Sequence, residues 1–103
     1  MCLEEKFAER LAQLRTQKGV SAREMSLSLG QSTGYINNIE NKNSLPSMSV
    51  FFYICDYFGI SPKEFFEFEV SNPTKLNSTI NDLKMLTPKC LENISAVIKD
   101  LKK

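Results

Sequence analysis

The chain has 103 residues, of which 42% are hydrophobic and 24% are charged, which predicts one soluble globular protein rather than a disordered segment. Thirteen Lys and Arg stand against twelve Asp and Glu, and a net charge of +1 argues against a strongly basic nucleic-acid coat protein. Histidine, the commonest general base and metal ligand, is absent, so enzymes and metalloproteins are disfavoured.

A first helix is predicted from apolar residues that recur at spacings of four, four and three. These residues are Leu3, Phe7, Leu11 and Leu14. The helix ends near Lys18-Gly19, because a basic residue suits the last turn and glycine suits the left-handed position after it.

Two short helices follow. The capping box Ser21-Ala22-Arg23-Glu24 opens the second helix, which keeps Met25 and Leu29 inward and stops at Gly30. Ser32 is expected to cap the third helix. That helix buries Ile36 and Ile39 and ends around Asn41-Lys42.

A fourth helix is predicted from about Met48 to Phe58, with Gly59 ending it. Its expected inward residues are Met48, Phe51, Phe52, Ile54, Cys55 and Phe58. A second capping box, Ser61-Pro62-Lys63-Glu64, opens a short fifth helix that contains Phe65 and Phe66. We interpret the phenylalanines as core packing rather than a ligand cage.

The last third of the chain predicts two further helices after an acidic linker at residues 67–72. Their start signals are Asn72-Pro73 and Thr87-Pro88. Their apolar stripes are Leu76, Ile80 and Leu83 on the first, and Leu91, Ile94, Val97, Ile98 and Leu101 on the second. No segment alternates with the period of a strand, so the predicted fold class is all-α.

Residues 22–39 carry the functional signal. Two short capped helices joined by a turn of three or four residues containing glycine form a helix-turn-helix arrangement. Small Ser26, four residues before Gly30, lets the helices cross closely, and the glycine permits a left-handed turn.

The segments FAERLAQLRTQKGVS, LGQSTGYINNIEN and LPSMSVFFYICDYFGISPKEFF resemble the Cro/repressor (XRE-like) helix-turn-helix family of phage and bacterial transcription regulators, over about Phe7 to Phe66. The resemblance implies five helices, the third of which is the recognition helix in the major groove, and dimeric binding to a two-fold operator. The chain departs from the family at four positions, where it has Ala22 for Gln, Ser26 for Ala, Gln31 for an apolar residue and Lys42 for Gly.

A helical wheel places the reading face of the third helix opposite Ile36 and Ile39. The expected base-reading residues are Thr33, Gly34, Asn37 and Asn38, since Asn pairs bidentately with adenine and Gly permits close approach. The expected contacts to the DNA backbone are Ser21, Arg23, Ser32, Tyr35, Asn41, Lys42 and Asn43. Without the surrounding motif, the same asparagines would more often be a solvated helix surface.

The family resemblance also pairs Arg15 with Glu40 as a structural ion pair that ties the first helix to the third. We assign this pair to stability rather than to DNA contact.

Charge is unevenly distributed, with net values of +1 for residues 1–43, −3 for 44–74 and +3 for 75–103. Because two amphipathic helices of this length are not stable alone in water, their apolar stripes must be buried. We expect residues 1–68 to form the helix-turn-helix DNA-binding domain, and residues 69–103 to form a helical extension for homodimerisation.

The predicted function is a sequence-specific, DNA-binding transcriptional repressor without enzymatic activity, cofactor, metal or small-molecule ligand. The three cysteines, Cys2, Cys55 and Cys90, are odd in number and far apart, which favours a reducing, cytoplasmic setting without a membrane segment. The alternative is an antitoxin-like or other module whose main partner is a protein and whose DNA binding is secondary.

Overall fold

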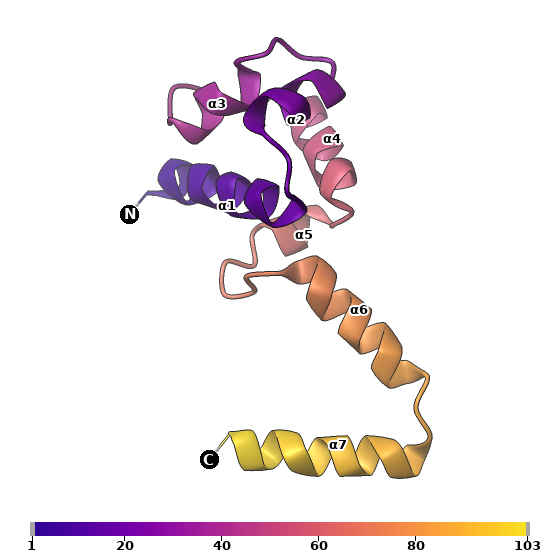
Figure 1. The fold of residues 1–103 in the computed structure, drawn as a ribbon. Coiled ribbons are helices and arrows are strands. Elements are labelled where there is room, and N and C mark those ends of the chain that lie inside the picture. The colour runs from indigo at the N-terminus through magenta and orange to yellow at the C-terminus, as the bar shows by residue number, and fades with distance from the viewer. Residues whose placement is uncertain (1, 103) are drawn as a thin grey trace.

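The computed structural model describes residues 2–102 and consists of helices throughout, with no strand in that range (Figure 1). The predicted all-α fold class is confirmed. The elements in chain order are α1 (Leu3–Lys18), α2 (Ala22–Ser28), α3 (Tyr35–Glu40), α4 (Met48–Phe58), α5 (Pro62–Phe65), α6 (Pro73–Lys84) and α7 (Pro88–Leu101).

Most of the helix boundaries that a capping signal marked are confirmed, and the start of α3, expected at Ser32, is the exception. Gly19 follows α1 with a left-handed φ of 78°. Ser21 and Ser61 open α2 and α5, each with both hydrogen bonds of the capping box. Asn72 and Thr87 cap α6 and α7 through their side chains, and a proline follows each of them. Side-chain caps of this kind fix helix starts locally, which is why the sequence predicts them well.

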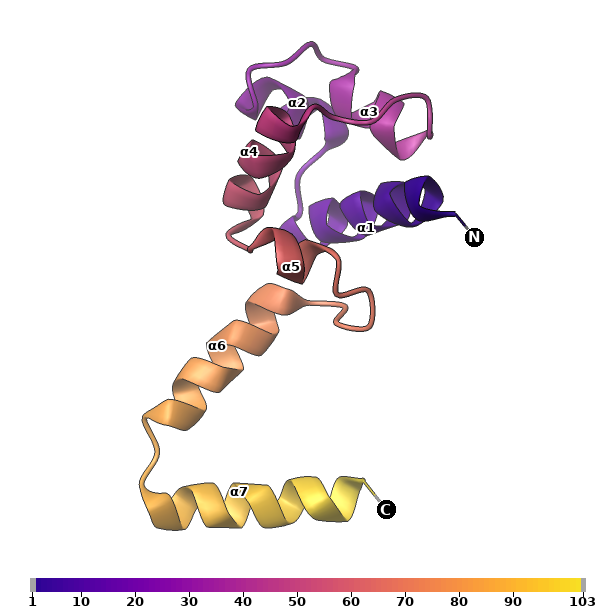
Figure 2. The same ribbon diagram turned by 180° about the vertical axis from the view of Figure 1, so that it is seen from behind.

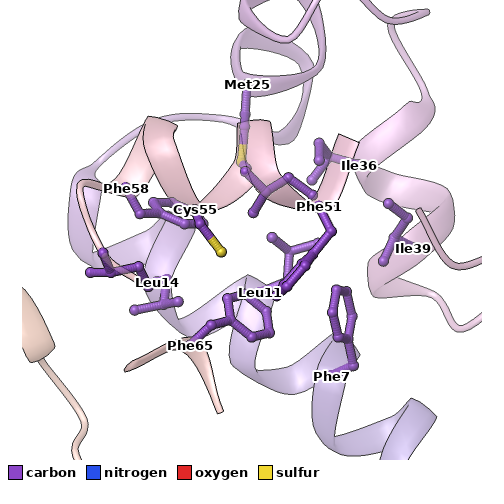
Figure 3. Close-up of a cluster of buried hydrophobic side chains, with 12 residues drawn as sticks. Phe7, Leu11, Leu14, Met25, Ile36, Ile39, Phe51, Cys55, Phe58 and Phe65 are labelled. Atoms are coloured by element: carbon purple, nitrogen blue, oxygen red, sulfur yellow. The ribbon is translucent and has the colours of Figure 1, made fainter. Parts of the chain in front are cut away.

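One hydrophobic core holds α1 to α5 together, and we call this unit the head (Figure 3). Leu11, Met25, Ile36, Ile54 and Phe65 have no exposed surface. These five residues come from five different helices, so the core fixes the direction of each helix relative to the others. The ring of Phe65 lies edge-on to that of Phe51 with a centroid distance of 5.2 Å.

Within the head, four residues predicted to face inward are exposed instead. Leu3 is 72% exposed, Met48 is 65%, Phe52 is 49% and Phe66 is 48%. Leu3 lies in the first turn of α1, beyond the reach of the core. On α4 the buried stripe is Phe51, Ile54, Cys55 and Phe58, and Met48 and Phe52, four residues apart, lie together on its flank.

The start of the third helix is also later than predicted. The N-cap is Gly34, which has no side chain to accept a hydrogen bond, and Ser32 does not cap the helix. Ser32 instead accepts the Tyr35 amide at its backbone carbonyl, at 3.1 Å. The connection between α2 and α3 therefore spans residues 29–34 and is longer than the expected three or four residues.

Helices α6 and α7 extend away from the head and form an open V, which we call the arm (Figures 1 and 2). Apart from Pro73, no residue of either helix is buried. The radius of gyration is 17.0 Å, against about 13 Å for a compact chain of this length. The apolar stripes of the arm are therefore exposed in the single chain.

None of the helices described between residues 2 and 102 combines the length and the apolar character that crossing a membrane requires.

Candidate nucleic-acid interface

Helix α3 is anchored to the core by one face and leaves its opposite face exposed. Ile36 and Ile39 are at most 1% exposed. Asn37 and Asn38, on the other side of the same two turns, are exposed. Within the described chain, neither asparagine side chain makes a hydrogen bond, so both amides keep their donors and acceptors free for a ligand.

The start of α3 is held by a side chain from α2. The Ile36 backbone amide donates a buried hydrogen bond to Ser26 Oγ at 3.0 Å. The Ser26 hydroxyl in turn donates to the Ala22 carbonyl oxygen at 2.7 Å. Because Gly34 offers no capping side chain, Ser26 performs the capping function from a neighbouring helix. From the sequence, Ser26 was expected only to be small enough for the two helices to cross closely. Its hydroxyl was the signal that could have indicated a hydrogen bond between the helices.

The end of α3 is tied to α1 by Arg15 and Glu40. Arg15 Nε lies 2.6 Å from Glu40 Oε2, and Arg15 Nη2 donates to Oε1 at 3.0 Å. Arg15 Nη1 also donates to the Val20 carbonyl at 2.9 Å. The hydrogen bond with Glu40 raises the pKa of Arg15, against the opposing effect of burial. The bidentate pair lies beside the core, away from the exposed asparagines.

Lys42 closes the C-terminal turn of α3 in a left-handed conformation, with a φ of 67°. It is the only residue other than glycine with a positive φ in the described chain. Glycine adopts this conformation without strain, whereas a residue with a Cβ atom does not. The turn presents the exposed side chains of Asn41, Lys42 and Asn43 next to the reading face.

The predicted contact residues lie on the α2–α3 unit, at the end of the head far from the arm (Figures 1 and 2). Those with exposed side chains or backbone are Ser21, Arg23, Ser32, Thr33, Gly34, Asn37, Asn38, Asn41, Lys42 and Asn43. Tyr35 is half-buried and packs against the core, and its burial raises the pKa of its hydroxyl. Ser21 also accepts the Glu24 amide at 3.0 Å, so its hydroxyl already has a structural role.

Sequence reasoning missed Arg10, which is 2% exposed on α1. Its Nε donates to the Phe65 carbonyl at 2.7 Å and its Nη2 donates to the Glu64 carbonyl at 2.8 Å. Its Nη1 donates to the Val70 carbonyl at 2.7 Å. The guanidinium therefore collects carbonyl oxygens at the end of α5 and in the linker, and this burial lowers its pKa. Arg10 follows Phe7 by three residues and precedes Leu14 by four, so a charge beside the apolar stripe was the signal that could have indicated its burial.

This surface has the chemistry of a nucleic-acid contact. An Asn side chain can donate to and accept from the major-groove edge of adenine at once. Short polar groups and cations around it suit phosphate oxygens. Within the described residues, no group of three or more Cys, Asp or Glu could hold a metal ion.

Comparison with known proteins gives one match. The model of a family described as a helix-turn-helix domain, which is associated with XRE-type regulators, matches residues 8–68, more than half of the chain. No curated protein matches the chain, and no solved structure does. The matched residues cover nearly all of the head and stop before the arm.

Proposed function

Because the chain belongs to the helix-turn-helix domain family, we propose that it is a sequence-specific DNA-binding transcriptional repressor that binds a two-fold operator as a homodimer. Helix α3 enters the major groove. Thr33, Gly34, Asn37 and Asn38 face the bases, while Ser21, Arg23, Ser32, Tyr35, Asn41, Lys42 and Asn43 contact the sugar-phosphate backbone. The protein acts without enzymatic chemistry, in the cytoplasm, where its free cysteines stay reduced.

The observation that carries this proposal is the contrast between the two faces of α3. Its inner face is fully packed, and both its ends are held from other helices by Ser26 and Arg15. Its outer face presents free amide side chains at Asn37 and Asn38. A helix held this firmly can bring hydrogen-bonding groups to base edges at fixed positions, as specific recognition requires.

The low net charge of the head favours binding as two copies. The part of the head that carries α1 to α3, residues 1–43, has a net charge of only +1, and α4 and α5 add no further net positive charge, so one head gains little from phosphate neutralisation. Two heads on one duplex double the contacts, and their recognition helices must then be separated by roughly 34 Å to enter successive major grooves.

The exposed surface of the single chain supports the same conclusion. The chain exposes 7066 Å², whereas a compact monomer of this mass exposes about 5,900 Å². The excess of about 1,200 Å² exceeds the roughly 800 Å² that each partner buries in a standard interface. On the arm, Ile94, Val97 and Ile98 are each 41–54% exposed. We assign residues 1–68 to DNA binding and residues 69–103 to dimerisation on these grounds.

Selection from random duplexes at two salt concentrations tests the DNA-binding part of the proposal. We expect enrichment of a palindromic site. With that site, Asn38→Ala should relax base preference, whereas Lys42→Ala should weaken binding to all sequences by a similar factor. Failure to enrich any palindrome, or identical behaviour of the two variants, would contradict the proposed roles.

Sedimentation of the full chain tests the dimer. We expect a dimer at tens of micromolar, and a monomer with an intact head for the double variant Ile94→Asp/Ile98→Asp. The matched control is Asn93→Asp, which adds charge to α7 without altering its apolar stripe. A wild-type monomer that also fails to dimerise on operator DNA would overturn the homodimer. Stoichiometric co-purification with a different protein through the same face would favour the protein-interaction alternative.

A further inference from the structure

The junction between head and arm is held at a small number of defined points. Pro73, the first residue of α6, is among the fully buried side chains. One turn further along, Asn77 Nδ2 donates to Glu64 Oε2 at 2.5 Å. Two fixed points one turn apart determine the direction of a helix axis, so Pro73 acts as the pivot of α6 and Asn77 fixes its angle.

The rest of α6 is weakly supported. An open groove of about 410 Å³ lies between the first turns of α6 and the head. It is lined by Leu14, Gln17, Lys18 and Phe58 from the head and by Asn72, Thr74, Lys75 and Ser78 from the start of the arm. Because packing is missing on this side, α6 has room to swing about Pro73 once the hydrogen bond at Asn77 is lost.

Glu64 is the residue that joins this contact to the rigid head. Its Oε1 accepts the Ser61 amide at 3.0 Å and completes the capping box of α5. Its backbone carbonyl accepts from Arg10 on α1. The neighbouring Phe65 is fully buried in the core. The carboxylate therefore has a fixed position, and only its second oxygen serves the arm.

A continuous set of contacts consequently leads from the recognition helix to the arm. Glu40 on α3 binds Arg15 on α1. Arg10, on the same helix, binds the carbonyl oxygens of α5. Glu64 on α5 then binds Asn77 on α6. In a dimer joined through the arms, the direction of α6 decides where the two recognition helices stand relative to each other.

We propose that the Asn77–Glu64 hydrogen bond is a specificity-determining contact, because it fixes the angle between arm and head and thereby selects the spacing of the two operator half-sites. The proposal rests on the proposed dimeric DNA binding. Asn77 is a positioning residue that contacts no DNA. Its effect on binding is a change of preference among spacings rather than a uniform loss of affinity.

The test uses a reversible exchange of the two groups. Asn77→Asp places two carboxylates in contact and breaks the hydrogen bond. Adding Glu64→Gln restores the hydrogen bond with donor and acceptor exchanged, because the amide nitrogen introduced at position 64 donates to the carboxylate introduced at position 77. The amide oxygen at position 64 still accepts from the Ser61 backbone, since Gln can replace Glu in a capping box. Asn81→Asp is the matched control, since Asn81 is exposed one turn further along α6 and the charge change is the same.

Each full-length protein is titrated with duplexes in which the selected half-sites are separated by a series of spacers. We expect the wild type and Asn81→Asp to bind duplexes with one spacing about tenfold or more tightly than duplexes with the others. A tenfold difference in affinity corresponds to the free energy of about one charge-assisted hydrogen bond. Asn77→Asp should lose most of this preference, and the double variant should regain it. If Asn77→Asp keeps the wild-type ratio between spacings while its affinity falls uniformly, the residue has only a structural role and the inference is wrong.

A second readout needs no DNA. Spin labels are attached to Cys2 on the head and to a cysteine introduced at the end of α6 by Lys84→Cys. The background variant Cys90→Ser removes the other exposed thiol. Labelled chains are diluted into excess unlabelled protein, so that each distance is measured within one chain. The distance distribution should be narrow, broaden in Asn77→Asp and narrow again in the double variant. Unchanged distributions would overturn the inference. If they change as expected while the wild type binds no paired half-sites, the arm–head contact stands and the proposed function fails.

Discussion

Ser26 Oγ accepts the backbone amide of Ile36 at 3.0 Å, so a side chain of α2 caps the recognition helix α3. The hydroxyl is fully buried and has a second bond to the Ala22 carbonyl. In this way the two helices of the helix-turn-helix unit are joined by a hydrogen bond as well as by packing. The contact fixes the start of the helix that carries Asn37 and Asn38.

Ser26→Ala should therefore destabilise the head by about 1–2 kcal/mol, because it removes a cap and leaves the Ile36 amide buried without a partner. Urea unfolding measures the change. Ser28→Ala, at an exposed position of the same helix, is the control and should change stability by less than about 0.5 kcal/mol. Equal effects at the two positions would contradict the capping role.

Removal of either partner of the Arg15–Glu40 pair should cost about 3 kcal/mol, since the side chains are only 20% and 12% exposed and the remaining charge would lie partly buried. A double-mutant cycle with Arg15→Ala and Glu40→Ala measures the coupling. The Lys63–Glu67 pair is the matched control, because its atoms lie 4.0 Å apart and Lys63 is 86% exposed. Its coupling should stay below about 1 kcal/mol.

Lys42→Gly should raise the stability of the head while weakening its binding to DNA. A left-handed residue with a Cβ atom costs about 1–2 kcal/mol, and the greater freedom of glycine in the unfolded chain offsets about 0.5–1 kcal/mol of this. We expect a net gain of about 0.5–1 kcal/mol in thermal or urea unfolding, together with weaker binding to all duplexes. Lys42→Ala should show the weaker binding without the gain in stability.

Acid should weaken the junction through Glu64. Hydrogen bonds from the Ser61 amide and then from Asn77 hold the pKa of this carboxyl below its ordinary value. Its contribution to stability is therefore complete above the pKa of an unfolded Glu, about 4.3, and is lost as the pH falls through the lower folded value. Urea unfolding across this acid range should show a steeper loss of stability for wild type than for Glu64→Gln. Identical pH profiles would contradict the assignment.

Cys55 should react with thiol reagents only when the head unfolds. Burial, with a smaller effect of Asp56, raises the pKa of its thiol to about 11, and the thiolate is the reactive form. Cys2 and Cys90 are exposed. Mass spectrometry after alkylation at neutral pH should find two modified cysteines in the native protein and three in urea. Rapid native modification of Cys55 would show that the core opens locally.

The start of α2 and the start of α5 show what a local sequence determines. In both, a serine accepts an amide three residues on and a glutamate bonds back, so every atom of the motif lies within four residues. The same holds for the left-handed glycines that end α1 and α4. Such features need no tertiary contact, which is why the sequence predicts these helix starts and ends correctly.

The start of α3 shows where local reasoning fails. Ser32 satisfies the sequence rule for an N-cap, yet the helix begins at Tyr35, where the Ser26 hydroxyl supplies the missing acceptor. The exposed Phe52 and Phe66 are a similar case, because residues at the edge of an apolar stripe are covered only if a neighbouring helix reaches them. Neither outcome is set by residues close in the chain.

The sequence by itself determined the helices, most of the core stripe on α1 to α5 and the exposed asparagine face of α3, because capping and helical periodicity are properties of short segments. Only the tertiary structure decided that Arg10 collects carbonyl oxygens 54 to 60 residues away and that Glu64 holds Asn77. Hydrogen bonds between residues so far apart in the chain depend on how the core packs one helix against another. Capping motifs and helical periodicity describe single segments, so they do not predict that packing geometry.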